Sequence, residues 1–263
     1  MMNIKRRKKM LKIVITLLTI SIVGGGSFAL YKGTRYQKEA VPTAVKLAEL
    51  TQQTVEGTTQ GATGELEKEI VPPIELNLQM DFYAQAPFGN WDYPWQEACE
   101  EASILLVANE YFGHNWTAEQ FNDQILEMVE WEKDRFGDYW HTTAAQTAEI
   151  LRDELGLESV VHKNPTLNDV KKILAKGHFI VGFFDGKKLG NPFYKNGGPV
   201  YHVMVVKGYK ADGKIITHDV GTRRGEDYVY TWATIENALH DYAEPMEDGE
   251  KVMLEVLPPG YGF

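Results

Sequence analysis

The sequence of 263 residues predicts an α+β fold, in which a helical half precedes a mostly antiparallel sheet. Helical segments with capping residues occupy residues 96–175. β-Branched and aromatic runs dominate from residue 179 onward, and the turn Ala211-Asp212-Gly213 joins two of them. Helices that come first and strands that follow are typical of α+β domains rather than of alternating βαβ units. Because 43% of the residues are hydrophobic, the chain can bury one sizeable core.

Four helices are expected first, and then five strands interrupted by one further helix. The first helix, QEACEEASILLVANEYFG, ends at Gly113, because glycine commonly ends helices. Thr117 with Gln120 fits a capping box and begins the second helix, and Thr166 with Asp169 begins the fourth. The other predictions are helices over 142–155 and 233–242 and strands over 179–184, 200–209, 214–220, 227–232 and 251–257.

The amino terminus, residues 1–32, is predicted to be a targeting segment. Residues 5–9 are all Lys or Arg, and the 19 residues from Ile13 to Tyr31 carry no charge. A signal anchor needs about 20 apolar residues, whereas a cleaved signal peptide needs a shorter apolar run and a small-x-small site, which Ser27-Phe28-Ala29 offers. Both place the body outside the cytoplasm. We expect a single-pass protein of the cell membrane, or a secreted one if the segment is cleaved.

Residues 33–73 are expected to form a stalk, and residues 74–263 the folded domain. The stalk has a short helical pattern over residues 43–57, followed by a polar Gly/Thr-rich stretch with the composition of a flexible linker. The charge of the body argues against a nucleic-acid partner. Residues 1–38 hold nine Lys or Arg residues and no Asp or Glu, which leaves 18 basic against 37 acidic residues elsewhere. Such an acidic body repels phosphate groups.

Cys99 is the only cysteine in the chain, and it lies at the start of the first predicted helix. It has no intramolecular disulfide partner, so its thiol is free to react. The partial positive charge of a helix N-terminus favours the thiolate, which is the nucleophile of thiol hydrolases. The other interpretation is a small buried core residue, because cysteine often packs in cores.

A thiol hydrolase also needs a base and a group that orients the base. If the turn centres on Ala211-Asp212, His202 lies opposite Gly221 and becomes a diagonal neighbour of Asp219 on one face of the sheet. His218 then points to the opposite face, which predicts a structural role for it. Taken alone, His202 also fits an ordinary strand histidine.

Other chemistries lack their motifs. The sequence contains no HExxH, GxSxG or GxxxxGK[ST]. A metal site formed by His202, His218 and Asp219 is disfavoured, because the two histidines are expected on opposite faces. We therefore expect neither a metal nor another cofactor.

With these residues identified, the chain resembles the papain-like cysteine peptidases of the bacteriocin-processing (double-glycine leader) family, particularly their stand-alone exported relatives. The resemblance is carried by YAQAPFGNWDYPWQEACEEASILLVANEYFG (83–113), NGGPVYHVMVVKGY (196–209) and ITHDVGTRRGEDYVYTW (216–232). It implies a papain-like fold whose helical half carries Cys99 and whose sheet carries His202 and Asp219. It also implies a peptide or protein substrate.

The resemblance implies a role for each residue. Cys99 is expected to be the nucleophile, with its pKa depressed by an ion pair with His202. His202 is expected to take the thiol proton and return it to the leaving amine, and Asp219 to orient the imidazole. Gln85, together with the backbone N–H of Cys99, is expected to stabilise the oxyanion, and Gln96 is the alternative donor.

The aromatic loop before Cys99 contains Trp91 and Trp95, which are expected to bind substrate or, alternatively, to anchor the loop in the core. Glu100 and Glu101 stand where the exporter-linked peptidases usually have Gly-Pro, and they would oppose thiolate formation if they faced the thiol. The expected function is an extracytoplasmic cysteine peptidase that cleaves a peptide or isopeptide bond through a thioester on Cys99. The alternatives are a catalytically inactive module that binds peptide or cell-wall partners at the membrane surface, and acyl transfer to an amine. The oligomeric state is left open.

Overall fold

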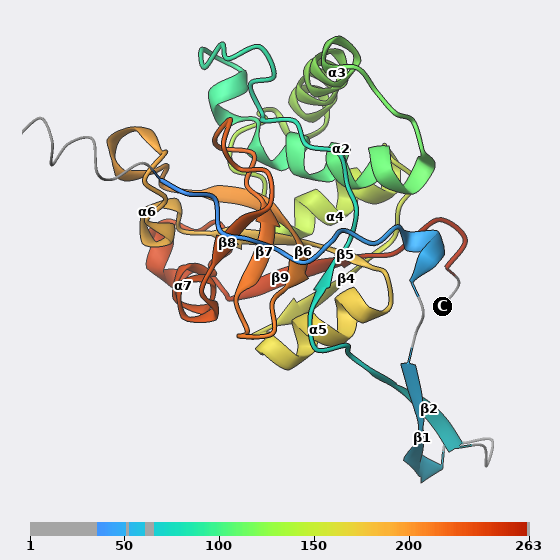
Figure 1. The fold of residues 1–263 in the computed structure, drawn as a ribbon. Coiled ribbons are helices and arrows are strands. Elements are labelled where there is room, and N and C mark those ends of the chain that lie inside the picture. The colour runs from blue at the N-terminus through green and yellow to red at the C-terminus, as the bar shows by residue number, and fades with distance from the viewer. Residues whose placement is uncertain (1–35, 51–52, 61–65, 262–263) are drawn as a thin grey trace, which may run out of the picture. The chain divides into compact units, whose positions relative to one another are not determined.

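A seven-stranded sheet lies at the centre of the protein (Figure 1). The computed structural model describes residues 36–50, 53–60 and 66–261. Residues 1–39 and 40–263 form two separate units. The described part of the first unit, residues 36–39, contains no helix or strand. The fold below is therefore that of the second unit.

The strands of this sheet are β3 (Leu76–Asn77), β4 (Ser159–Lys163), β5 (Phe179–Phe184), β6 (His202–Tyr209), β7 (Ile215–His218), β8 (Tyr228–Tyr230) and β9 (Val252–Val256). Their order is β4-β9-β5-β6-β7-β8, with β3 paired to β6, and each of these pairs is antiparallel. Both β5 and β6 are buried along their whole length. The near-continuous apolar runs of these two strands follow from burial on both faces.

The α-helices of the described residues are α2 (Cys99–Phe112), α3 (Ala118–Phe136), α4 (Ala144–Asp153), α5 (Leu167–Ala175), α6 (Gly186–Leu189) and α7 (Trp232–Ala238). Single 3₁₀ turns lie at η1 (Leu47–Glu49), η2 (Trp95–Glu97), η3 (Lys195–Gly197) and η4 (Met246–Asp248). The capping boxes predicted at Thr117 and Thr166 are confirmed, and α2 ends at Gly113 in the left-handed conformation. The α+β class is confirmed. β4 was not predicted, because its five residues are only partly buried and alternate weakly.

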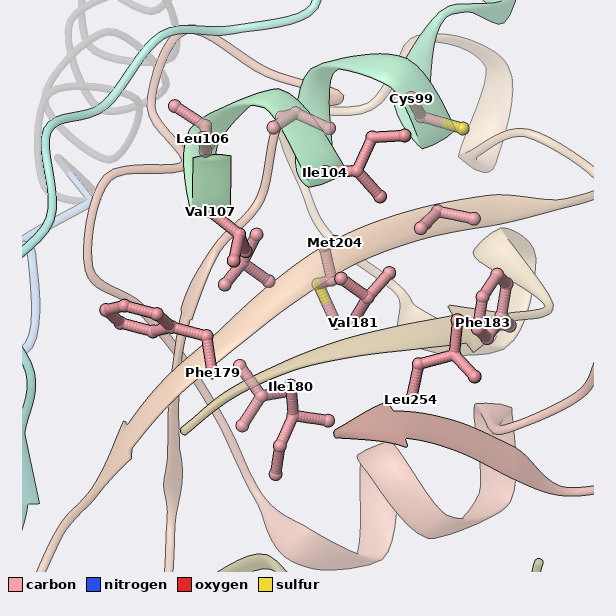
Figure 2. Packing of buried hydrophobic residues seen from close by; sticks show 14 of the residues in the cluster. Cys99, Ile104, Leu106, Val107, Phe179, Ile180, Val181, Phe183, Met204 and Leu254 are labelled. Carbon is pink, nitrogen blue, oxygen red and sulfur yellow. The ribbon is translucent and has the colours of Figure 1, made fainter. Parts of the chain in front are cut away.

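Helix α2 lies across β5 and β6 and is buried from Cys99 to Asn109 (Figure 1). Figure 2 shows Ile104 and Val107 of this helix above Val181 and Met204 of the sheet. All four side chains are fully buried. Each such side chain contributes roughly 1.5–3 kcal/mol of burial free energy, so this contact fixes the helix firmly on the sheet.

The helical pattern expected in the stalk is wrong. Between residues 43 and 57 the structure has only the 3₁₀ turn η1, and Gln53–Gln60 forms strand β1. β1 pairs with β2 (Leu66–Val71) in a separate antiparallel hairpin. The segment before η1 joins the main sheet, because the backbone N–H of Val45 donates to the carbonyl oxygen of Asn77 over 2.8 Å. The prediction of a helix was based on a few apolar residues at helical spacing. Hydrogen bonds between the backbone of these segments and neighbouring strands override such a weak local preference.

The predicted location in the cell membrane is contradicted by the structure. Across residues 36–50, 53–60 and 66–261, no helix combines the length and the apolar character needed to cross a bilayer. The segment on which that prediction was based, Ile13–Tyr31, lies outside the described residues. The prediction rested only on the hydropathy of that segment and on the charges that flank it. The predicted location in the cell membrane is therefore withdrawn.

A buried glutamate on β9 connects three segments of the chain near the β4 end of the sheet. Glu255 of β9 accepts hydrogen bonds from His162 Nε2 at 2.7 Å, His178 Nδ1 at 2.6 Å and Lys176 Nζ at 3.1 Å. Burial alone would raise the pKa of Glu255, but these hydrogen bonds and the charge of Lys176 outweigh it and hold the pKa well below its ordinary value.

Replacing Glu255 with Gln is expected to lower the free energy of unfolding at neutral pH by about 2–4 kcal/mol, because hydrogen bonds to a buried charge are lost. A carboxyl group with a lowered folded-state pKa stabilises the fold above its ordinary pKa and loses this effect as the pH falls. The deficit should therefore shrink between about pH 5 and pH 3 in urea unfolding followed by circular dichroism. Glu250→Gln, at an exposed ion pair with Lys163, is the control, and an equal loss in both variants would contradict the prediction.

Candidate active site

Cys99 occupies the first residue of α2, where the helix lacks a side-chain cap. Helices α3, α4 and α5 all begin with a threonine capping box, but the residue before Cys99 is Ala98. The first N–H groups of α2 are therefore left to other acceptors, at the positive end of the helix. The thiol lies beside the beginning of β6, because the Val203 backbone forms a hydrogen bond with it. Ser103 Oγ also donates to the carbonyl oxygen of Val203 at 3.2 Å.

His202, the first residue of β6, meets Asp219, which directly follows β7. The hairpin register predicted for β6 and β7 is confirmed near the site, where Val205 pairs with His218. Towards the turn the register shifts by one residue between Val206 and Gly208, so a β-bulge separates the turn from the site. His202 Nε2 donates to Asp219 Oδ1 over 2.9 Å.

Asp219 is fully buried, and donors surround its carboxylate. Asn191 Nδ2, Tyr194 OH and Tyr230 OH donate to Oδ2 at 2.8, 2.7 and 2.6 Å. The backbone N–H of Gly221 donates to Oδ1 at 3.1 Å. Burial alone would raise the pKa of Asp219, but His202 and these hydrogen bonds outweigh it and lower the pKa. The carboxylate is thus charged and fixed.

The three side chains that donate to Oδ2 were not predicted. Asn191 and Tyr194 lie in an irregular segment before η3, and only their position between two strands hinted at a role. Gly221 matters for space as well: a Cβ atom there would lie 2.7 Å from Cε1 of His202. The imidazole therefore needs glycine at this position in order to reach Asp219.

The thiol of Cys99 donates to Glu100 Oε2 over 2.9 Å. Both residues are buried. Burial raises the pKa of Cys99 well above its ordinary value, and the charge of Glu100 together with this hydrogen bond raises it further. The predicted depression of the thiol pKa is therefore wrong for this arrangement of side chains. Burial, together with the carboxylate that faces the sulfur, therefore has more effect on the thiol pKa than the helix N-terminus.

Two further acidic side chains, Glu101 and Glu132, are buried near Glu100. Neither oxygen of Glu101 or Glu132, nor Oε1 of Glu100, has a hydrogen-bond partner among the described residues. Burial raises the pKa of Glu132 to about 9, with a further contribution from Glu100. Burial and the charges of Glu132 and Glu100 raise the pKa of Glu101 well above its ordinary value. A buried carboxyl group without donors is stable only when it is protonated.

Gln85 is buried behind the loop that leads to Cys99. Its Nε2 donates to the carbonyl oxygens of Trp95 at 2.8 Å and Gln96 at 3.0 Å. Its backbone N–H donates to the carbonyl oxygen of Val220, next to Asp219, at 3.0 Å. Gln85 thus links the nucleophile loop to the Asp219 turn. Gln96, the alternative oxyanion donor, is exposed and donates to Glu97.

The aromatic residues predicted to bind substrate have different surroundings. Trp95 packs against the core, and its Nε1 donates to Asn122 of α3 at 2.9 Å. Trp91 is half-buried. A more exposed aromatic pair lies nearby in the sequence, where Tyr93 stacks on Trp140 with their ring centroids 5.3 Å apart.

His218 is buried on its own set of partners. Its Nε2 donates to the carbonyl oxygen of Met80 at 3.1 Å, and its Nδ1 accepts the backbone N–H of Asp227 at 3.2 Å. Burial, with the charge of Lys207, lowers the pKa of His218 to about 3. Its hydrogen bonds are of the kind that a structural histidine makes. Within the described ranges, no group of three or more His, Cys, Asp or Glu side chains is arranged to hold a metal ion.

One family of proteins and several solved structures are similar to this chain. The sequence model described as "Peptidase_C39 like family" matches residues 77–244. A protein from Bacillus anthracis described as a C39-like peptidase is similar at 13% identity, over 67% of this chain and 94% of its own, with a TM-score of 0.45. The cysteine protease interpain A of Prevotella intermedia is similar at 18% identity, over 81% of this chain and 75% of its own, with a TM-score of 0.31. A search of curated proteins finds no match. The family match, with the helices and the mostly antiparallel sheet described above, confirms the predicted papain-like fold class.

Replacing Asp219 with Asn is expected to lower the free energy of unfolding at neutral pH by about 2–4 kcal/mol, because an amide N–H then faces donors in a buried site. The pKa of Asp219 is lowered from 3.8, so its stabilising effect is present above that value and is lost as the pH falls below it. Thermal unfolding from neutral to acidic pH measures this. Asp212→Asn, in the exposed turn, is the matched control and should change little. Equal losses in the two variants would show that the donors do not matter.

Replacing Glu132 with Gln is expected to change how stability depends on pH. A carboxyl group with a raised folded-state pKa stabilises the fold at low pH, and this effect is lost as the pH rises towards that pKa. Wild-type stability should therefore fall between about pH 5 and pH 9, and Glu132→Gln should reduce that fall. Denaturant unfolding at several pH values measures the slope. The control is Glu127→Gln, on the exposed side of α3, and an unchanged slope in Glu132→Gln would refute the expectation.

Proposed function

Because the chain belongs to the Peptidase_C39-like family, we propose that it is an active cysteine peptidase that cleaves a peptide or isopeptide bond through a thioester on Cys99. The observation that carries the proposal is the buried His202–Asp219 pair: His202 begins β6, the strand against which the Cys99 helix packs, and Asp219 follows β7. A base held by an ionised, fully hydrogen-bonded carboxylate is the arrangement that orients a catalytic imidazole. The bacteriocin-processing subtype stays a prediction.

In the proposed reaction, Nε2 of His202 stays on Asp219, so Nδ1 takes the proton of the Cys99 thiol. The thiolate attacks the carbonyl carbon, and the C–N bond breaks as His202 returns the proton to the leaving amine. Water then attacks the thioester, with His202 again taking and returning a proton. Asp219 stays ionised throughout, because its donors hold the negative charge.

The oxyanion is proposed to bind the backbone N–H of Cys99, at the uncapped start of α2, and the side chain of Gln85. Gln85 has to release one of its two carbonyl contacts in order to donate to substrate. Until then it fixes the loop before Cys99. Trp91 and Trp95 are retained as proposed contacts for the substrate, with Trp95 held in place by Asn122.

A second candidate function is a catalytically inactive module of the same fold that binds peptide. The hydrogen bond from Cys99 to Glu100 and the raised thiol pKa favour it, because both oppose the thiolate. Acyl transfer to an amine uses the same three residues as hydrolysis and differs in its product.

Hydrolysis of unfolded casein and of a mixed peptide library by the full chain under reducing conditions tests the proposal. We expect new amino termini in mass spectrometry between about pH 5 and pH 8, and a loss of at least about 1,000-fold in Cys99→Ser and His202→Ala. His114→Ala, at an exposed histidine after α2, is the control and should keep the activity.

Equal cleavage by Cys99→Ser would overturn the assignment of the nucleophile. No cleavage and no labelling of Cys99 by a peptidyl electrophile at any pH would favour the binding module. Products joined to an added amine would identify acyl transfer instead of hydrolysis.

A further inference from the structure

Glu100 is the side chain that contacts the sulfur of the proposed nucleophile. The thiol hydrogen bond of Cys99 runs to Glu100 Oε2 over 2.9 Å. Nε2 of His202 is engaged with Asp219, so the imidazole has Nδ1 for the thiol proton. In the proposed reaction, the Glu100 carboxylate and the His202 imidazole therefore compete for one proton, that of the Cys99 thiol.

The surroundings of Glu100 favour its neutral form. From α2 itself, Cys99 and Glu101 face it; Glu97 faces it from η2, and Glu132 from α3. Tyr201, just before β6, and the backbone of Thr142, before α4, complete its surroundings. Desolvation is the main reason why the neutral form is favoured, and the charge of Glu97 adds repulsion, while the hydrogen bonds with Cys99 and with the backbone of Thr142 act in the opposite direction.

Two negative charges side by side are not stable in such a place. At effective dielectric constants typical of proteins, like charges about 3 Å apart repel by several kcal/mol. A Cys99 thiolate next to a Glu100 carboxylate is therefore excluded over the ordinary pH range. A thiolate next to a protonated Glu100 is stabilised instead, because the carboxyl O–H donates to the sulfur.

We propose that Glu100 is a catalytic residue that controls the nucleophile through its own protonation state. When Glu100 is neutral, the thiol proton moves from Sγ to Nδ1 of His202, and the Glu100 O–H donates to the thiolate. When Glu100 is charged, it accepts the thiol hydrogen bond and holds Cys99 in its unreactive form. Glu100 keeps its own proton through acylation and deacylation, so the proton balance of the proposed reaction is unchanged. This inference rests on the proposed function, since it concerns the same nucleophile and base.

The consequence is an enzyme that is active in acid and loses activity as the pH rises past neutrality. Burial raises the pKa of Glu100 to about 7, while its hydrogen bond with Cys99 acts in the opposite direction. The group is charged above that pKa, so the reactive state is present below it and is lost as the pH rises through it. An ordinary isolated thiol behaves in the opposite way, because it becomes more reactive towards its pKa of about 8.5.

The test is the rate of Cys99 alkylation by iodoacetamide in the full chain against pH. Since Cys99 is the only cysteine, no other thiol contributes. We expect Glu100→Gln to react at least about tenfold faster than the wild type near pH 8, and within about threefold of it near pH 5.5. Glu127→Gln, on the exposed side of α3, is the control: it removes an acid that contacts neither the sulfur nor Glu100, and its ratio to wild type should stay within about threefold at both pH values.

A merely structural role for Glu100 would change the rate by the same factor at both pH values, and that result would overturn the proposal. The infrared S–H stretching band of the wild-type chain gives a second readout that does not depend on a variant folding. The single thiol should give an S–H band while Glu100 is charged, and this band should weaken as the pH falls through the titration of Glu100 near neutral pH. A band of constant intensity would also overturn the proposal.

These outcomes are separable from a failure of the proposed function. Peptide cleavage that depends on Cys99 and His202, with parallel profiles in wild type and Glu100→Gln, would remove Glu100 from the mechanism and leave the peptidase intact. A second outcome is an S–H band that changes with pH in a chain that cleaves no peptide. That outcome would contradict the proposed peptidase function and still show that Cys99 is coupled to Glu100.

Discussion

The buried carboxylate of Asp219 is the group on which the arrangement of the site depends. A charge without solvent is tolerated only when donors replace the water, and here they come from separate parts of the chain. His202 comes from the start of β6, Tyr230 from β8, and Asn191 and Tyr194 from the segment before η3. Each donor fixes its own segment relative to the turn after β7. The position of the His202 imidazole therefore depends on all the segments that hold Asp219 in place.

The acids next to Cys99 have the opposite environment. Glu100, Glu101 and Glu132 are as deeply buried as Asp219, but five of their six oxygens have no hydrogen-bond partner among the described residues. Hydrogen bonding lowers the pKa of Asp219, whereas desolvation raises the pKa of all three glutamates. Environments that separate the pKa values of nearby acids in this way are a feature of sites that move protons. The site thus combines one carboxylate that stays charged, that of Asp219, with three buried glutamates whose neutral forms are favoured.

Helix α2 connects these two environments. Its apolar residues, among them Ile104 and Val107, pack on β5 and β6 (Figure 2), which sets the height of Cys99 above the strand that begins with His202. Its N-terminus has no side-chain cap, because Ala98 stands at the capping position. The first two residues of the helix are the proposed nucleophile, Cys99, and Glu100, the acid that contacts its thiol. The packing of α2 on the sheet therefore determines where both Cys99 and Glu100 lie.

The sequence by itself determined the α+β class, the helix ends at Gly113, Thr117 and Thr166, and the hairpin register that brings His202 towards Asp219. These features follow from local rules, because capping, side-chain alternation and turn residues act within a few positions of the chain. It did not determine that 43–57 would join strands rather than form a helix, nor did it reveal Asn191, Tyr194 and Tyr230 as partners of Asp219. Only the tertiary structure decided that Glu100 faces the thiol, since the direction of a side chain in the first turn of a buried helix depends on what packs around it. The raised pKa of the thiol follows first from burial and then from that contact, whereas the helix N-terminus alone predicts a lowered pKa.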